Sequence, residues 1–253
     1  MLESYLKQRK TKKDILLMTH IVLGYPTFED SYNIIAAMVA AGVDLMELQI
    51  PFSEPIADGP VILHANQKAL AGGATVRKCL DFSKEVSRTF DIPFLFMSYY
   101  NILFKYGVER FASEMAHRGL HGAIVPDLPP EEGREYLEAM GKNDLSPIFI
   151  FSPTTPAARM QYLASFGRGF IYCVARKGVT GIATDFSEDL EHYLARCRTA
   201  THLPLALGFG VKEKSDIDFL KGKVDIAVIG TQTIRLVDRA GTAAVGEFIQ
   251  SLC

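Results

Sequence analysis

Two acidic side chains, Glu47 and Asp58, lie where an apolar segment gives way to a stiff loop. Residues 44–50 are mostly apolar, and in a strand their side chains alternate between two faces. Positions 46, 48 and 50 are all apolar, so Glu47 and Gln49 share the other face. A partly desolvated carboxyl group there is suited to general acid/base chemistry, and buried acids are rare. The alternative is a structural acid that hydrogen-bonds other interior polar groups.

The loop at residues 51–60 contains three prolines and a glycine, a composition that predicts a stiff turn rather than a helix. It places Asp58 over the end of the strand that carries Glu47. Two carboxyl groups in unlike environments form a candidate acid/base pair. Equally, Asp58 is in the position of a turn or N-cap residue before a helix near Leu63.

Glycines follow two later apolar segments and indicate an anion site. Gly208, Phe209 and Gly210 come after one segment, and Gly230 and Thr231 come after the next and open a helix. Backbone N–H groups approach an oxyanion closely at glycines and at helix N-termini, and a threonine hydroxyl adds a further donor. We therefore predict that these loops hold a phosphate. The alternative is that they are ordinary turn glycines.

A fourth loop, residues 175–185, carries two glycines and two cations. Such a loop can close over a site and exclude water. A solvated surface loop has the same composition, and the residues alone do not separate these alternatives.

Eight short apolar segments that could position these groups alternate with amphipathic patterns. The apolar segments are residues 15–23, 44–50, 94–99, 122–125, 148–151, 170–174, 204–207 and 225–229. The helical patterns are residues 30–41, 76–90, 108–118, 131–140, 156–166, 188–197, 214–220 and 231–252, the last broken near Gly241. Continuous apolar strands are typical of parallel sheets that are covered on both faces.

Eight strand–helix units in 253 residues predict an α/β protein, a single (βα)8 TIM barrel domain over residues 1–253 with extra short helices. An open doubly wound sheet is the alternative, but no GxGxxG motif follows the first strand. Catalytic groups of such barrels lie at the C-terminal ends of the strands. The acids and the glycine loops are therefore expected at one mouth.

Composition excludes several classes of protein. A formal charge of −2 gives no basic surface for nucleic acid, and no apolar stretch approaches the ~20 residues of a membrane span. The four cysteines are widely spaced and fit thiols in a reducing compartment. The histidines show no metal-ligand spacing, so no metal is expected. The start of the chain lacks a signal-peptide pattern, and we expect a cytoplasmic protein.

The run ELQIPFSEPIADGP resembles the signature of the tryptophan synthase alpha chain family. The resemblance continues through LGYP, PDLP, KGVTG, LGFG and IGTQ and covers nearly the whole chain. It implies cleavage of indole-3-glycerol phosphate to indole and glyceraldehyde 3-phosphate, without a metal or organic cofactor of its own. It further implies a complex with a pyridoxal-phosphate beta chain, as an alpha-beta-beta-alpha heterotetramer.

The resemblance also implies roles for individual residues. Glu47 is expected to protonate the indole ring carbon, and Asp58 to handle the indole N–H. The remaining expected contacts to substrate or to these acids are Gly181 with the phosphate loops, Phe209 and Ile62 as walls of the indole pocket, Thr180 on a closing lid, and Tyr172 near Glu47.

Departures from the family pattern, at Gln49, His20, Tyr25, Glu54 and Leu63, suggest an alternative function. Gln49 stands where a smaller residue is usual, and His20 replaces an apolar pocket residue. Gln49 is expected to crowd the indole or to hydrogen-bond Glu47 and weaken it as an acid. The alternative is thus a catalytically impaired alpha chain that mainly binds and activates its beta chain. A different phosphate-binding barrel enzyme, such as a sugar-phosphate isomerase, is disfavoured by the PFSEPIADGP run.

Overall fold

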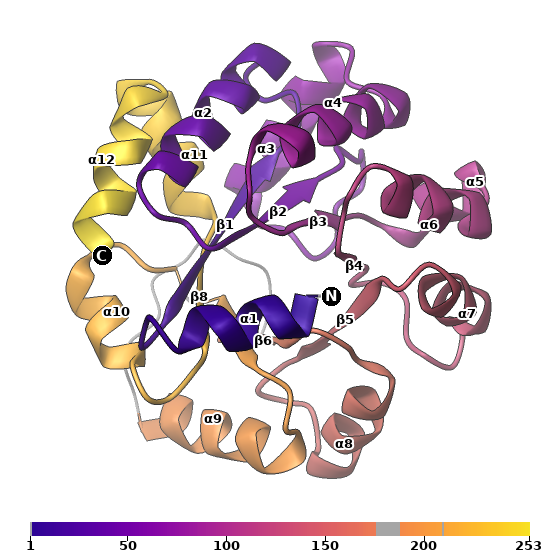
Figure 1. Ribbon diagram of the computed structural model, residues 1–253, viewed down its shortest axis with the longest axis vertical. Helices are drawn as coiled ribbons and strands as arrows, with labels where there is room; N and C mark the ends of the chain where they lie inside the picture. Colours follow the sequence, from indigo (N-terminus) through magenta and orange to yellow (C-terminus); the bar gives the residue numbers. More distant parts are fainter. Residues whose placement is uncertain (1, 176–187, 209) are drawn as a thin grey trace.

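The strands close into a ring of eight in which every neighbouring pair is parallel (Figure 1). The computed structural model describes residues 2–175, 188–208 and 210–253. The strands are β1 (Leu16–Val22), β2 (Leu45–Gln49), β3 (Phe94–Met97), β4 (Gly122–Ile124), β5 (Ser146–Phe151), β6 (Ile171–Val174), β7 (Leu205–Gly208) and β8 (Ile226–Ile229). All eight predicted strand segments are found, and the prediction of a TIM barrel is confirmed.

Helices surround this ring on its outer side, except α1, which lies across one end of it (Figure 1). They are α1 (Leu2–Lys10), α2 (Phe28–Ala40), α3 (Pro60–Ala71), α4 (Val76–Thr89), α5 (Tyr100–Tyr106), α6 (Val108–His117), α7 (Arg134–Lys142), α8 (Ala157–Phe166), α9 (Glu188–Ala200), α10 (Lys214–Leu220), α11 (Thr231–Ala240) and α12 (Ala243–Leu252). The predicted extra short helices are present, α5 among them. No helix in the described ranges is long and apolar enough to span a membrane.

Helix boundaries differ from the predicted ones where caps and prolines intervene. Helix α2 begins two residues earlier than predicted, because the Thr27 side chain caps it by accepting from the Asp30 backbone. Helix α7 begins only at Arg134, because the residues after Pro129 and Pro130 form a turn. The predicted break near Gly241 is confirmed, since this glycine ends α11 with a φ of 78°.

The two faces of each strand pack into two separate apolar clusters. Met46 and Leu48 belong to the outer cluster between strands and helices, whereas Leu45 belongs to the cluster inside the ring. Leu16 and Met18 of β1 also lie in the inner cluster. The alternation predicted for residues 44–50 is therefore confirmed, and every second residue of β1 and β2 faces the barrel interior.

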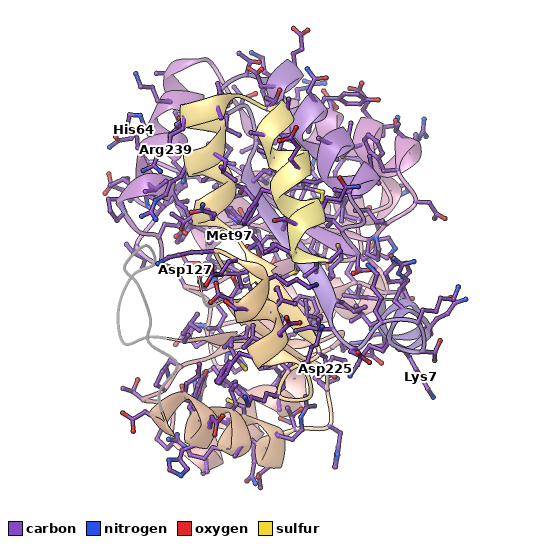
Figure 2. All side chains as sticks on the ribbon, turned by 90° about the vertical axis from the view of Figure 1, so that its left-hand side faces the viewer. Lys7, His64, Met97, Asp127, Asp225 and Arg239 are labelled. Atoms are coloured by element: carbon purple, nitrogen blue, oxygen red, sulfur yellow. The ribbon has the colours of Figure 1, made fainter. Side chains whose placement is uncertain are left out.

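Helix α1 covers the end of the barrel where the strands begin. Leu2 and Leu6 are buried in the inner cluster, and Arg9 forms an ion pair with Asp44, which directly precedes β2. Figure 2 shows Lys7 of α1 and Asp225, just before β8, toward one side of the molecule. The same view places Asp127, which follows β4, toward the opposite side. That opposite side is the mouth at which the strands end.

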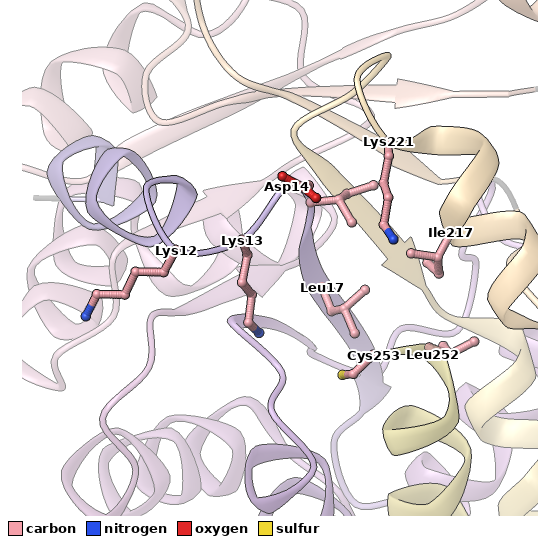
Figure 3. A pocket seen from close by; sticks show the side chains of 9 residues that line it. Lys12, Lys13, Asp14, Leu17, Ile217, Lys221, Leu252 and Cys253 are labelled. Carbon is pink, nitrogen blue, oxygen red and sulfur yellow. The ribbon is translucent and has the colours of Figure 1, made fainter.

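The end of the barrel where the strands begin, which α1 covers, is called the closed end below. A pocket lies on the surface at this end (Figure 3). It is lined by the end of the segment before β1 and the start of β1, by α10 and the residue after it, and by the last residues of the chain: Lys12, Lys13, Asp14, Ile15, Leu17, Ile217, Lys221, Leu252 and Cys253. Because it lies where the strands begin, this pocket is at the wrong end of the barrel to bring a substrate to Glu47.

Candidate active site

Glu47 and His20 face each other from neighbouring strands inside the barrel. The register of β1 and β2 pairs His20 directly with Glu47, and both side chains point inward. They are almost fully buried, with 3% and 4% of their surfaces exposed. His20 Nδ1 and Glu47 Oε1 are hydrogen-bonded at 2.8 Å. The predicted inward orientation of Glu47 is thus confirmed, and its closest polar partner is an imidazole.

Two polar atoms of this pair and one of Gln49 are buried without a hydrogen-bond partner in the part of the chain that the structure describes. They are Glu47 Oε2, His20 Nε2 and Gln49 Oε1. Buried polar atoms are almost always satisfied, and leaving one unpaired costs about 1–3 kcal/mol. Three such atoms on adjacent positions of two strands indicate a place where a polar ligand or water completes the hydrogen bonds.

Asp58 is held by two side chains that reach the same oxygen. Gln49 Nε2 donates to Asp58 Oδ2 at 2.7 Å, and the Tyr99 hydroxyl donates to it at 2.9 Å. Tyr99 also accepts from the Ala57 backbone, so it fixes the loop as well as the carboxylate. The N-cap of α3 is Gly59, with no side-chain bond, so the N-cap alternative for Asp58 is wrong.

The rest of the loop is anchored by Asn66 of α3. The Phe52 backbone N–H donates to Asn66 Oδ1, and Asn66 Nδ2 donates to the Ile62 carbonyl one turn earlier. Phe52 in turn stacks on Tyr99, with ring centroids 5.2 Å apart. The predicted stiffness of residues 51–60 therefore has a tertiary cause in addition to the prolines.

Gln49 takes a different partner from the one expected of it. Its amide donates to Asp58 and approaches Asn66 Oδ1 at 3.5 Å, and no hydrogen bond joins it to Glu47. The expected bond between Gln49 and Glu47 is therefore wrong. The position of Gln49 explains this, because it is the last residue of β2, nearer than Glu47 to the loop that carries Asp58.

The two carboxylates sit in unlike electrostatic surroundings. Burial, the largest influence, lowers the pKa of His20, but its hydrogen bond with Glu47 and the nearby carboxylate charges raise the pKa above its ordinary value. Burial raises the pKa of Asp58, and the charge of His20 and the two hydrogen bonds to Oδ2 offset part of that rise. An imidazole beside one acid and neutral donors on the other give the asymmetry that acid/base catalysis requires.

Tyr172 lies against Gly208 at the ends of β6 and β7. A Cβ atom placed on Gly208 would come within 2.9 Å of the Tyr172 ring, so this glycine makes room for the tyrosine. Burial, with smaller effects from the charges of Glu47 and Asp58, raises the pKa of Tyr172 well above its ordinary value. The Tyr172 hydroxyl therefore stays protonated, and the charges of both acids influence its pKa.

The predicted phosphate loops end neighbouring strands at the mouth. Gly230 directly follows β8 and is the N-cap of the ten-residue helix α11, whose first residue is Thr231. Gly210 follows β7, is exposed, and has a φ of 81° with open space where a side chain would project. A Cβ atom added to Gly230 would lie 3.7 Å from the Cβ of His20. Gly230 is therefore close to the residue that hydrogen-bonds Glu47.

Of the four remaining predicted site residues, only Ile62 lies in the described part of the chain. Ile62 is buried in a small cluster between α3, β1 and α11 that includes Val22 and Ile234. Thr180, Gly181 and Phe209 lie outside the described residues, as does most of the predicted lid loop.

Sequence reasoning missed two residues that organise the site. Tyr99 ends an apolar run and reads as a core aromatic, and it is indeed fully buried. Asn66 lies among apolar helix positions and is also fully buried. A buried asparagine on an apolar helix face was the available signal, because such a group must find partners.

Comparison with known proteins gives one consistent family. A model of the family "Tryptophan synthase alpha chain" matches residues 6–250. Proteins of that name from Desulforapulum autotrophicum and Syntrophotalea carbinolica are 64% and 63% identical to this chain over 252 residues, and the matches cover 100% of each chain. A solved structure of Mycobacterium tuberculosis tryptophan synthase has a TM-score of 0.93 at 27% identity, over 99% of this chain and 96% of that one.

A solved structure of the tryptophan synthase complex from Pyrococcus furiosus is also similar. Its TM-score is 0.86 at 26% identity, and the match covers 94% of this chain and 97% of that chain. The family match, residues 6–250, spans the positions of the acid pair and of the glycine loops.

Proposed function

This chain belongs to the tryptophan synthase alpha chain family, and we propose that Glu47 and Asp58 are the carboxylates that carry out its reaction. The reaction is the retro-aldol cleavage of indole-3-glycerol phosphate to indole and glyceraldehyde 3-phosphate. The observation that supports the assignment is the hydrogen-bonding of the two acids at the mouth. Glu47 has one buried oxygen bound to His20 and one without a partner in the described chain, and Asp58 is held through a single oxygen.

Glu47 serves as the proton donor and acceptor. The ring carbon that bears the glycerol chain gains a proton, its bond to the hydroxyl-bearing carbon breaks, and the bonding electrons restore the aromatic ring. The hydroxyl group loses its proton as the aldehyde forms. One proton is added and one is removed, so a carboxyl group that first donates and then accepts serves both steps. Glu47 Oε2, buried and without a protein partner in the described chain, is the atom that does this.

Asp58 binds the indole N–H. Protonation of the ring carbon develops positive charge on the ring nitrogen, and a carboxylate that accepts the N–H stabilises that charge in a water-poor site. Gln49 and Tyr99 fix Asp58 through Oδ2, which keeps the carboxylate in place before the substrate arrives. Thr180 of the lid would bond Asp58 on closure.

The phosphate binds at the ends of β7 and β8. Gly208, Gly210 and Gly230 lack side chains that would keep an oxyanion from the backbone, and the N-terminus of α11 adds its dipole and the Thr231 hydroxyl. Gly181 joins them from the lid. Phe209, Ile62 and Tyr172 line the indole end of the pocket.

The chain pairs with a tryptophan synthase beta chain, and we infer an alpha-beta-beta-alpha heterotetramer in the cytoplasm. It works as one barrel domain over residues 1–253 and needs no metal or organic cofactor of its own. Neither nucleic acid nor membrane is a partner. The comparisons support the alpha-chain function and do not favour the impaired alternative.

Single-turnover cleavage of indole-3-glycerol phosphate tests the assignment. Glu47→Gln is expected to lower the rate by ~10²–10⁴-fold, the usual contribution of a general acid/base group. Binding of glycerol 3-phosphate should stay near that of the wild type, because the phosphate loops belong to other strands. Glu54→Gln, the same change at an exposed position of the mouth, is the matched control. A Glu47→Gln rate above about half of the wild-type rate would exclude Glu47 as the acid.

A further inference from the structure

His20 has a hydrogen bond to Glu47 that the roles proposed for the two acids do not require. We propose that His20 is the positioning residue of Glu47: its Nδ1–H donates to Oε1, so that Oε2 alone meets the indole ring and carries the proton that Glu47 delivers, while the imidazole and the carboxyl group together hold one titrating proton. The proposal rests on Glu47 being the proton donor of the lyase reaction. It assigns to the pair, and not to Glu47 alone, the task of keeping one proton in the site.

The geometry leaves His20 and Glu47 little freedom. They are paired residues of hydrogen-bonded parallel strands, and both are at least 96% buried. On its other side, His20 is bounded by Gly230, which precedes α11. A Cβ atom added to Gly230 would lie 3.7 Å from the Cβ of His20. The register of the two strands therefore determines the 2.8 Å hydrogen bond, and no unusual side-chain conformation is needed to form it.

This bond divides the two oxygens of Glu47 between two tasks. Oε1 faces the imidazole, and Oε2 is buried without a partner in the described chain. A carboxyl group bound on one side only presents its remaining oxygen in one direction. Because a misplacement of about 1 Å can cost ~10²-fold in rate, holding Oε1 has a direct kinetic value.

The imidazole also stabilises the carboxylate that Glu47 becomes during the reaction. After Glu47 protonates the ring carbon, it is a buried carboxylate until the hydroxyl proton returns. A hydrogen bond from Nδ1–H to that carboxylate is charge-assisted and about twice as strong as one between neutral groups. Since the bond strengthens along the reaction, it accelerates the chemical step and leaves substrate binding nearly unchanged.

Three other ionisable groups face the pair or its ligand space. Asp58 approaches from the loop after β2, Tyr172 from β6, and Tyr99 from the end of β3. Both tyrosines have pKa values raised above their ordinary value by burial and by the nearby carboxylate charge, so they stay neutral across the working range of pH. The net direction for His20 is a raised pKa, which keeps its proton in the site as pH increases.

The first test is the pH profile of single-turnover cleavage at saturating substrate without beta chain. His20→Asn keeps a donor near Nδ1 but cannot hold the proton, and His20→Leu removes both. The wild-type rate should fall only as pH rises above the ordinary imidazole value of about 6.5. In His20→Asn the rate should no longer fall in that pH range, because the imidazole that titrates there is gone. In His20→Leu the plateau rate should drop about tenfold, with little change in KM.

Matched controls separate this proposal from the function on which it rests. His64→Asn makes the same exchange at an exposed position of α3 and should reproduce the wild-type profile. Glu47→Gln reports on the catalytic assignment: if it remains active, the assignment of Glu47 fails. If it is inactive while His20→Asn superimposes on the wild type, or His20→Leu is as fast as the wild type, the role of His20 is overturned.

A measurement that needs no activity completes the test. NMR titration of the imidazole signals, with His20 identified by its loss in His20→Asn, should give a midpoint above the ordinary value. In Glu47→Gln the midpoint of His20 should fall below that value, because burial then acts without the carboxylate. An unchanged midpoint would show that the pair does not share a proton and would overturn the proposal.

Discussion

In the described chain, Asp58 accepts its two side-chain hydrogen bonds, from Gln49 and Tyr99, on the same oxygen. Gln49 therefore positions this carboxylate as well as filling space. Gln49 is fully buried and bridges the strand to the loop through Asp58 and Asn66. A hydrogen bond to a charged group contributes about 1.5–3 kcal/mol when it is buried. The expected crowding of the indole by Gln49 and this positioning effect act in opposite directions on the rate.

Two substitutions at Gln49 separate these effects. Gln49→Leu keeps the volume and removes the donor to Asp58, so single-turnover cleavage should slow by about tenfold, while glycerol 3-phosphate binding stays unchanged. Gln49→Gly removes volume and donor together and should also be slower than the wild type. If Gln49→Gly is instead faster, crowding dominates and Gln49 restrains the reaction. Asn66→Asp is unsuitable as a control, because Asn66 itself anchors Phe52.

Strand alternation predicted which way Glu47 and Gln49 point, but it did not predict which acid Gln49 would bond. Alternation fixes the face of a residue, whereas a long amide side chain selects its partner by rotamer and by the path of the loop above it. Tyr99 escaped notice for the same reason, since an apolar run that ends in tyrosine does not reveal where its hydroxyl goes. Residues from one strand were predictable, and contacts between a strand and a loop were not.

At the scale of elements, the register of β1 and β2 and the start of α11 assemble the site. All eight strands could be predicted because parallel barrel strands are apolar on both faces. Helix limits were less predictable, since they depend on individual caps such as Thr27 and on turns such as that after Pro130. The glycine loops were found from their position after strands, which the closed barrel confirms as neighbouring ends.

The phosphate assignment leads to a test at the ends of β7 and β8. Gly210→Asp places a negative charge in open space beside the anion site and forces an L-residue into a positive φ, so binding of glycerol 3-phosphate should weaken by at least about tenfold. Gly222→Asp is a matched control, because Gly222 has a φ of 78° and equally open surroundings but precedes β8 at the closed end. Calorimetric titration that finds equal affinities for the two variants would place the phosphate elsewhere.

At the scale of the whole molecule, the two ends of the barrel are built for different purposes. The closed end is sealed by α1 and by ion pairs to Asp44 and Asp225, two acids that directly precede strands. The open end carries the partly unsatisfied acids and two of the few large apolar side chains that are exposed in the described chain. These are Ile56, 73% exposed, and Phe104, 62% exposed. Exposed apolar groups rimmed by polar ones are typical of a protein interface.

Ile56 and Phe104 belong to neighbouring parts of that open end. Ile56 lies in the loop after β2, and Phe104 lies on α5, which begins directly after Tyr99. The bond from the Ala57 backbone to the Tyr99 hydroxyl joins the two segments, and Asp127 accepts from the Tyr100 backbone at the start of α5. Both apolar side chains are therefore presented by anchored backbone, which lowers the entropy lost on binding a partner.

The last prediction concerns this surface, because indole leaves the barrel at the same end. Ile56→Ser and Glu54→Lys should each weaken association with the beta chain of the same organism by at least about tenfold in Kd, which is about 1.4 kcal/mol. Tyr162→Ser, on α8 and 41% exposed, removes an exposed aromatic group from a different part of the surface and should bind as the wild type does. Calorimetric titration gives the affinities, and circular dichroism should be the same for all four proteins. Wild-type affinity in both loop variants would mean that the beta chain docks away from residues 52–58. The contact with the beta chain would then have to lie on another element of the mouth.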